Sequence, residues 1–343
     1  MDNWQLFAGQ RVVRIFRQMD AGNPQDAPAA FPGPLIVCGM HRSGTSLTAA
    51  VLAGAGLHLG DELLGASRDN QRGHFEDLEI LAFHRNVLVA NGLLSEGYTT
   101  QAEFMIPERL RRLAVAHVAA RGGWQGAWGW KEPRTTLFLD FWRELVPDAR
   151  FLLLFRRPWE VVDSLLRRNE ATFHWNPGFA VDVWQHYNAR LLKFAEQHPA
   201  DVLVAELHQV IGDPHSLVAT VRQRFGLELS TPTDCYEPEL LGRNVAPSQL
   251  ALFVAACPQA YELYLRLRTL AGSESPLPNI SPAAGDAASL RDHVLTAWGQ
   301  ATQYRLRCHE AEQRCAEAAA ARRWHARRWR GLIQRFPRQS KAA

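Results

Sequence analysis

The sequence predicts an α/β fold, in which a parallel sheet is covered by helices on both faces. Short apolar runs that are bounded by Pro or Gly indicate buried strands, and the longer segments between them indicate helices. Strands that alternate with helices in this way are typical of parallel sheets. The 343 residues, of which 47% are hydrophobic and 21% charged, suffice for one large domain with an appendage or for two domains.

Along the chain, four segments are expected to be strands and seven to be helices. The strands are expected at residues 35–38, 128–131, 150–155 and 201–205. The helices are expected at residues 44–55, 76–90, 107–120, 135–145, from 158 onward, 179–197 and 287–335. Pro158 supports one of these helices, because proline is favoured at the first helical position. The order of elements is that of a three-layer α/β/α arrangement followed by a long C-terminal helix.

Both ends of the chain differ in composition from the centre. Residues 1–33 combine a short amphipathic helical pattern with a linker that contains Pro and Gly, and residues 272–286 form a second linker. We therefore expect one domain at residues 34–271 and a basic C-terminal helix and tail at residues 287–343.

Several classes of protein are excluded by composition. No run of about 18 apolar residues occurs, which argues against a membrane-spanning helix. The N-terminal pattern lacks the apolar centre of a secretory signal peptide. The five cysteines are scattered and form no Cys-x-x-Cys pair, so neither a zinc site nor a disulfide framework is expected. These features favour a cytoplasmic protein.

A candidate anion-binding loop, Gly39–Ser46, joins the first expected strand to the helix after it. Its glycines permit a tight turn, and the N–H groups at the start of a helix attract an anion. Arg42 adds a full positive charge, and three residues of the loop add hydroxyl groups. The pattern is close to the GxxxxGK[ST] motif, but Thr45 stands at the lysine position. This difference favours a smaller anionic group over a triphosphate with Mg²⁺.

Residues 34–46 resemble the 5′-phosphosulfate loop of sulfotransferases that use 3′-phosphoadenosine 5′-phosphosulfate (PAPS). The likeness is greatest to the bacterial carbohydrate-type branch, with its His-Arg-Ser-Gly-Thr-Ser signature, and extends over about residues 34–245. It implies a P-loop-kinase-like α/β/α fold and PAPS as the cofactor, with adenosine 3′,5′-bisphosphate as its product and no metal. The loop residues that it implies around the 5′-phosphate are His41, Arg42, Ser43, Gly44, Thr45 and Ser46.

A second anion site is expected after the strongest strand. Arg156 follows that strand, and Ser164 lies about two turns into the next helix. Because the carboxyl ends of parallel strands share one edge, Arg156 is expected to face the same crevice as the loop, where it could bind a phosphate. Taken alone, the pair is better explained by an arginine that caps the strand and a serine that faces solvent. The spacing of Arg156, Pro158 and Ser164 is similar to the family's 3′-phosphate motif, and two anion sites suit PAPS better than ATP.

Sulfuryl transfer needs a base for the acceptor hydroxyl and donors for the leaving phosphate. Glu76 lies at the start of an expected helix, where an acid also complements the helix dipole. The carbohydrate-type branch places a similar Gly-x-Phe-Glu segment between its phosphate motifs. The resemblance therefore implies Glu76 as the base, with His74 and Asp77 as alternatives.

Lys131, at the end of a short expected strand, is interpreted either as a donor to the leaving group, together with Arg42, or as a solvated lysine. The cytosolic small-molecule branch carries Lys-Thr-His at this place, whereas Glu132 and Pro133 follow the lysine here. The missing histidine argues against steroid or phenol acceptors and leaves Glu132 as a minor rival to Glu76. Arg243 is only weakly similar to late phosphate contacts of the family. Arg134 is interpreted either as an acceptor contact or as part of a structural ion pair, and His84, His117 and His186 are interpreted as ordinary helix residues.

The formal charge of +3 is unevenly distributed along the chain. Eleven Lys or Arg and three acids in residues 302–343 give this tail +8 and leave −5 for residues 1–301. An apolar stripe in the tail runs from Trp329 to Phe336 among arginines. It suits either an anionic surface at the inner face of the membrane or packing on the body or on a partner. Nucleic acid is not expected as a partner, because the body is acidic and contains no nucleic-acid module.

The resemblance thus implies a PAPS-dependent sulfotransferase that acts on a hydroxyl, with a carbohydrate or glycolipid as the acceptor. Two alternatives stay open. One is a P-loop kinase that uses ATP, against which Thr45 counts. The other is a non-catalytic protein of the membrane surface with a degenerate nucleotide site. The sequence predicts neither the identity of the acceptor nor the oligomeric state.

Overall fold

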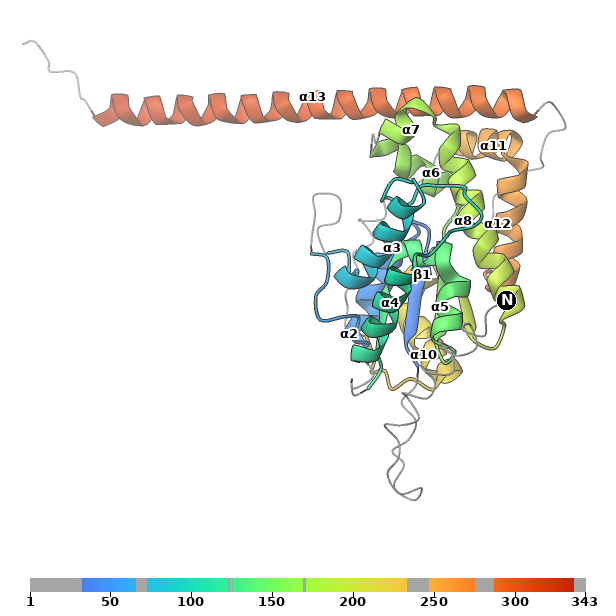
Figure 1. The fold of residues 1–343 in the computed structure, drawn as a ribbon. Helices are drawn as coiled ribbons and strands as arrows, with labels where there is room; N and C mark the ends of the chain where they lie inside the picture. The colour runs from blue at the N-terminus through green and yellow to red at the C-terminus, as the bar shows by residue number, and fades with distance from the viewer. Residues whose placement is uncertain are drawn as a thin grey trace, which may run out of the picture.

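Four parallel strands in the order β2-β1-β3-β4 form the central sheet of a computed structural model of the chain (Figure 1). The structure describes residues 33–65, 73–121, 124, 126–168, 171–232, 247–274 and 287–335. The strands are β1 (Leu35–Gly39), β2 (Gly129–Lys131), β3 (Arg150–Phe155) and β4 (Val202–Glu206). The parallel sheet and its four strands were each predicted from the sequence, and these predictions are confirmed.

Side chains of the two central strands alternate between two hydrophobic layers. Ile36 and Cys38 of β1 belong to one buried cluster, whereas Leu35 and Val37 belong to the other. On the second side lie α2 (Thr45–Gly54), α9 (Leu207–Gly212) and α10 (Pro214–Phe225). Burial on both faces explains why these strands are continuously apolar, and it confirms the predicted three-layer α/β/α architecture.

The first layer, on the side of Ile36, holds most of the remaining helices (Figure 1). These are α3 (Leu78–Ala90), α4 (Glu108–Arg121), the 3₁₀ helix η1 (Pro133–Phe138), α5 (Leu139–Leu145), α6 (Pro158–Arg167), α7 (Ala171–Trp175), α8 (Gly178–Gln197), α11 (Pro247–Ala256) and α12 (Pro258–Leu270). The sequence indicated no separate α7, α9, α10, α11 or α12. The helix expected at residues 135–145 is divided, because Phe138 leaves the helical conformation with φ −126° and ψ 26°.

The helix that was expected to begin at Glu76 begins two residues later. Asp77 is its N-cap, and the Asp77 carboxylate accepts hydrogen bonds from the N–H groups of Glu79 and Ile80. Glu76 itself is extended and forms a parallel β-bridge with Lys131. The acid that complements the helix dipole is therefore Asp77, and Glu76 belongs to the edge of the sheet.

The predicted C-terminal helix is α13 (Ala287–Arg335), whose 49 residues give a length of about 73 Å. Leu295 and Trp298 bury its first turns against α6 and α11. From Tyr304, which is 67% exposed, the helix extends away from the body (Figure 1).

Several sequence predictions lie outside the described residues. These are the N-terminal amphipathic helix, most of the linker at residues 272–286, Arg243, and the side chains of the stripe from Trp329 to Phe336. Among the described helices, none combines enough length and apolar character to cross a membrane.

Candidate active site

The phosphate loop owes its shape to two residues with positive φ. Gly44 has φ +86°, and a Cβ at this position would lie 2.2 Å from Cδ1 of Leu207, so glycine is required. Arg42 has φ 70°, a conformation that is uncommon for a residue with a side chain. Ser43 N–H closes the turn on the Met40 carbonyl at 3.1 Å. The loop therefore ends where α2 begins, at Thr45, so that the N-terminus of the helix adjoins the loop.

The two predicted anion motifs meet in space. Arg42 Nε donates to Ser164 Oγ at 2.8 Å, and Arg156 donates to the Arg42 carbonyl at 3.3 Å. Burial and the positive charges of Arg168 and Arg156 lower the pKa of Arg42 to about 10, so its guanidinium stays charged at neutral pH. A place where several guanidinium groups gather favours an anion. Arg168, one turn after Ser164, is a member of this group that sequence reasoning missed.

Glu160 fixes the orientation of Arg156. Its Oε2 accepts from Arg156 Nε at 2.7 Å, and its Oε1 lies 3.3 Å from His208 Nε2. Burial opposes ionisation of this carboxyl, but the hydrogen bond with His208 and the charge of Arg156 lower the pKa of Glu160 to about 2. The i, i+4 spacing of Arg156 and Glu160 is a signal that could have predicted this pair.

Glu76 and Lys131 form a buried ion pair beside the phosphate loop. Lys131 Nζ donates to Glu76 Oε1 at 2.8 Å, to Ser46 Oγ at 3.1 Å and to the His74 carbonyl at 2.9 Å. Both residues are largely buried, with exposures of 6% for Glu76 and 1% for Lys131. Burial lowers the pKa of Lys131, and the charge of Glu76 opposes this shift. Three separate segments thus bring a carboxylate, an ammonium and a hydroxyl together.

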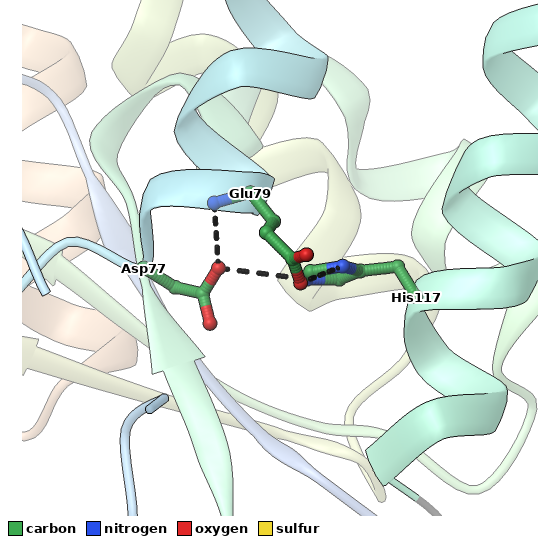
Figure 2. Close-up of side chains that lie close together, drawn as sticks. All are labelled: Asp77, Glu79 and His117. Atoms are coloured by element: carbon green, nitrogen blue, oxygen red, sulfur yellow. Dashed lines mark hydrogen bonds and ion pairs between the residues drawn. The ribbon is translucent and has the colours of Figure 1, made fainter. Parts of the chain in front are cut away.

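Asp77 takes part in a network of ion pairs that connects α3 with α4. Its carboxylate caps α3 and pairs with Arg121, and Glu79 pairs with His117 and Arg121. Figure 2 shows that the side chains of Asp77, Glu79 and His117 lie close together. Each offers an atom that could bind a metal ion, and these atoms lie within 4.8 Å of one another. Burial opposes ionisation of Asp77, but hydrogen bonds from His117 and Ile80 and the charge of Arg121 lower its pKa. Because a guanidinium already lies against both carboxylates, we interpret the cluster as structural.

Glu132 follows strand β2 and faces the layer of α3 and α5. It is fully buried, with one oxygen 2.6 Å from His84 Nδ1 and the other 2.5 Å from an Arg134 nitrogen. His84 Nε2 accepts a hydrogen bond from Trp142 Nε1 at 2.9 Å. The pair with Glu132 agrees with the structural ion pair that was one interpretation of Arg134. No spacing along the chain connects His84 to Glu132.

His41 lies in the loop with its ring centroid 5.3 Å from that of Tyr98. Burial and the charge of Arg134 lower the pKa of His41 well below 6.5. Within the described part of the chain, its buried Nε2 has no hydrogen-bond partner, and neither does the buried hydroxyl of Ser43. The unpaired hydroxyl of Ser43 and the tight turn at Gly44 together fit a phosphate group.

The chain resembles known proteins in both sequence and structure. A family model described as "Sulfotransferase family" matches residues 34–231, and a search of curated proteins found no significant match. Sulfotransferase STF1 of Mycobacterium tuberculosis is 16% identical, with 77% of this chain and 84% of that chain covered and a TM-score of 0.44. Sulfotransferase STF9 of Mycobacterium avium is 14% identical, with 81% of this chain and 84% of that chain covered and a TM-score of 0.43. The sulfotransferase domain of a Synechococcus olefin synthase is 18% identical, with 75% of this chain and 100% of that chain covered and a TM-score of 0.41.

The family match covers more than half of the chain. It coincides with the parallel sheet, the phosphate loop after β1 and the second anion motif after β3. The P-loop-kinase-like fold that the resemblance implied is thereby confirmed. The chain belongs to the sulfotransferase family.

Proposed function

We propose that this sulfotransferase moves the sulfuryl group of PAPS to a hydroxyl of a carbohydrate or glycolipid. The observation that carries the proposal is the Glu76–Lys131 pair, which adjoins Ser46 of the phosphate loop. A carboxylate and an ammonium lie next to a hydroxyl of the phosphate loop, which supports the roles that we propose for them. The role of each site residue is part of the proposal.

PAPS, when bound, supplies an activated sulfuryl group and a phosphate leaving group. The loop N–H groups, the Ser43 hydroxyl and Arg42 would hold the 5′-phosphate. Arg156 and Ser164 would hold the 3′-phosphate, and Arg168 adds charge on the same side. The link from Arg42 Nε to Ser164 Oγ supports this division, because it brings the two phosphate sites together at the carboxyl edge of the sheet.

Glu76 would accept the proton of the acceptor hydroxyl as the oxygen forms its bond to sulfur. The bond between sulfur and the bridging oxygen breaks, and its electron pair stays on the phosphate. Lys131 and Arg42 would stabilise that negative charge. Proton transfer neutralises Glu76, which weakens its attraction for Lys131 and releases the ammonium to the leaving group.

The acceptor class and the location are inferred from features of the sequence. A carbohydrate or glycolipid acceptor, and a bacterial setting, follow from the resemblance of the loop and of the Gly-His-Phe-Glu segment to the carbohydrate-type branch. A cytoplasmic location follows from the scattered cysteines. Contact with an anionic membrane follows from the +8 charge of residues 302–343.

Thermal unfolding with nucleotides tests the donor. Adenosine 3′,5′-bisphosphate at about 100 times its dissociation constant should stabilise the fold by about 2.7 kcal/mol and raise the Tm, whereas ATP with Mg²⁺ should not. Equal stabilisation by ATP would favour the kinase alternative, against which Thr45 at the lysine position already counts. Binding of the bisphosphate without transfer to any acceptor would favour the non-catalytic alternative.

A further inference from the structure

We propose that His84 and Glu132 are positioning residues, which keep Lys131 fixed and charged while Glu76 takes up a proton. The proposal rests on the function proposed above. It concerns a chain of buried hydrogen bonds behind strand β2, which the mechanism so far does not use.

The chain of hydrogen bonds connects three elements of the first layer. Trp142 of α5 donates to His84 of α3, His84 meets one oxygen of Glu132, and Arg134 of η1 meets the other. Glu132 directly follows Lys131, and its N–H donates to the Val37 carbonyl of β1 at 3.3 Å. Glu132, the residue after Lys131, is therefore held in place through both its main chain and its side chain.

His84 acts in this chain as a neutral donor. Its Nε2 accepts from Trp142, which places its proton on Nδ1, facing Glu132. Burial lowers the pKa of His84, although the charge of Glu132 opposes the shift. A neutral imidazole gives the Glu132 carboxylate a hydrogen bond without cancelling its charge.

Glu132 is unsuited to be the base. It is fully buried and faces the layer of α3 and α5, whereas Glu76 meets Lys131 beside the loop. Successive side chains of a strand point to opposite faces, so Lys131 and Glu132 lie on opposite sides of β2. Both oxygens of Glu132 are already engaged.

The charge on Glu132 has its effect at the moment of transfer. Lys131 is fully buried, and its direct counter-charge is Glu76. When Glu76 takes the acceptor proton, that counter-charge disappears, and an isolated buried ammonium tends to lose its proton. Glu132 remains ionised, because Arg134 and His84 lower its pKa against the effect of burial. Glu132 raises the pKa of Lys131 more than its partner Arg134 lowers it, so the pair favours the charged ammonium until the leaving phosphate arrives.

The test compares full-length variants at His84. Transfer from radiolabelled PAPS to polysaccharide extracted from cell envelopes is measured at saturating PAPS, together with the KM for PAPS and the Tm shift caused by adenosine 3′,5′-bisphosphate. His84→Phe removes the hydrogen bond to Glu132 and should lower turnover about tenfold or more, with KM and the Tm shift unchanged. His84→Asn keeps a nitrogen donor at the Nδ1 position and should retain most of the turnover.

Phe141→Leu is the matched control, because it loosens the packing of the same buried layer without removing a hydrogen bond of the chain from Trp142 to Glu132. It should lower stability but leave turnover near that of the wild type. Equal losses in His84→Asn and His84→Phe, or no loss in either, would overturn the proposal. If His84→Phe does not fold, His84→Gln replaces it, since its amide cannot donate from the Nδ1 position. Absence of transfer by the wild type would instead overturn the proposed function, and this proposal with it.

Discussion

Replacement of Glu76 by Gln separates the chemical role of this carboxylate from its structural role. The amide has the same shape and keeps an oxygen that can accept from Lys131 Nζ, now 2.8 Å from Glu76 Oε1. Lys131 also keeps its bonds to Ser46 Oγ and the His74 carbonyl. What is lost is the charge of the pair and the ability to take up a proton.

We expect two effects of different size. Breaking a buried ion pair costs about 3–5 kcal/mol, but the three retained acceptors should reduce the loss in unfolding free energy to about 1–3 kcal/mol. Loss of the base should reduce the transfer rate about 10²- to 10⁴-fold. The double variant Glu76→Gln/Lys131→Met should recover part of the stability, since no unpaired charge is left buried, and none of the rate.

Urea unfolding measures the first effect, and transfer from radiolabelled PAPS measures the second. Glu62→Gln, at an exposed position of the loop before α3, is the control and should change neither. A Glu76→Gln enzyme that folds and still transfers within about threefold of the wild-type rate would refute the assignment of Glu76 as the base.

Three further predictions follow from the geometry. Gly44→Ala should abolish the Tm shift by adenosine 3′,5′-bisphosphate, because φ +86° and the contact with Leu207 exclude a Cβ; an unchanged shift would contradict the loop assignment. Burial lowers the pKa of His84 below 6.5, so below about pH 6.5 the unfolded chain binds a proton that the folded chain does not. The unfolding free energy should fall with decreasing pH by up to about 1.4 kcal/mol per unit from this residue, and His84→Asn should reduce that slope in urea titrations at several pH values. A chain that ends at Arg307 should keep the Tm and the bisphosphate shift, since the described side chains at residues 308–318 are exposed; loss of either would show that the distal helix supports the body.

The sequence predicted the sheet because its strands are buried on both faces. Phe151–Phe155 and Leu35–Cys38 are apolar without interruption, and this pattern is typical of strands covered by two layers. The phosphate loop was predicted for a similar reason, since its glycine and hydroxyl residues occupy adjacent positions of one turn. The five unpredicted helices are short or follow one another closely, and α9 and α10 are separated only by Asp213.

Contacts between distant segments explain what sequence could not supply. Glu132 was a rival base because it neighbours Lys131, but its side chain is paired with His84, 48 positions earlier. The start of α3 was misplaced by two residues because Glu76 and Asp77 are both acidic, and only the pairing with Lys131 across the sheet edge distinguishes them. Arg168 was missed because its neighbour Arg42 is 126 positions away.

The measurement that tests the account most directly is transfer of radiolabelled sulfate from PAPS to polysaccharide and glycolipid fractions of the cell envelope. Wild-type enzyme, Glu76→Gln and Arg42→Ala are compared at equal concentration. The account predicts labelled product with the wild-type enzyme and a loss of about 10²-fold or more in both variants. The account would be contradicted if Glu76→Gln and Arg42→Ala formed labelled product as fast as the wild-type enzyme, or if the wild-type enzyme formed none.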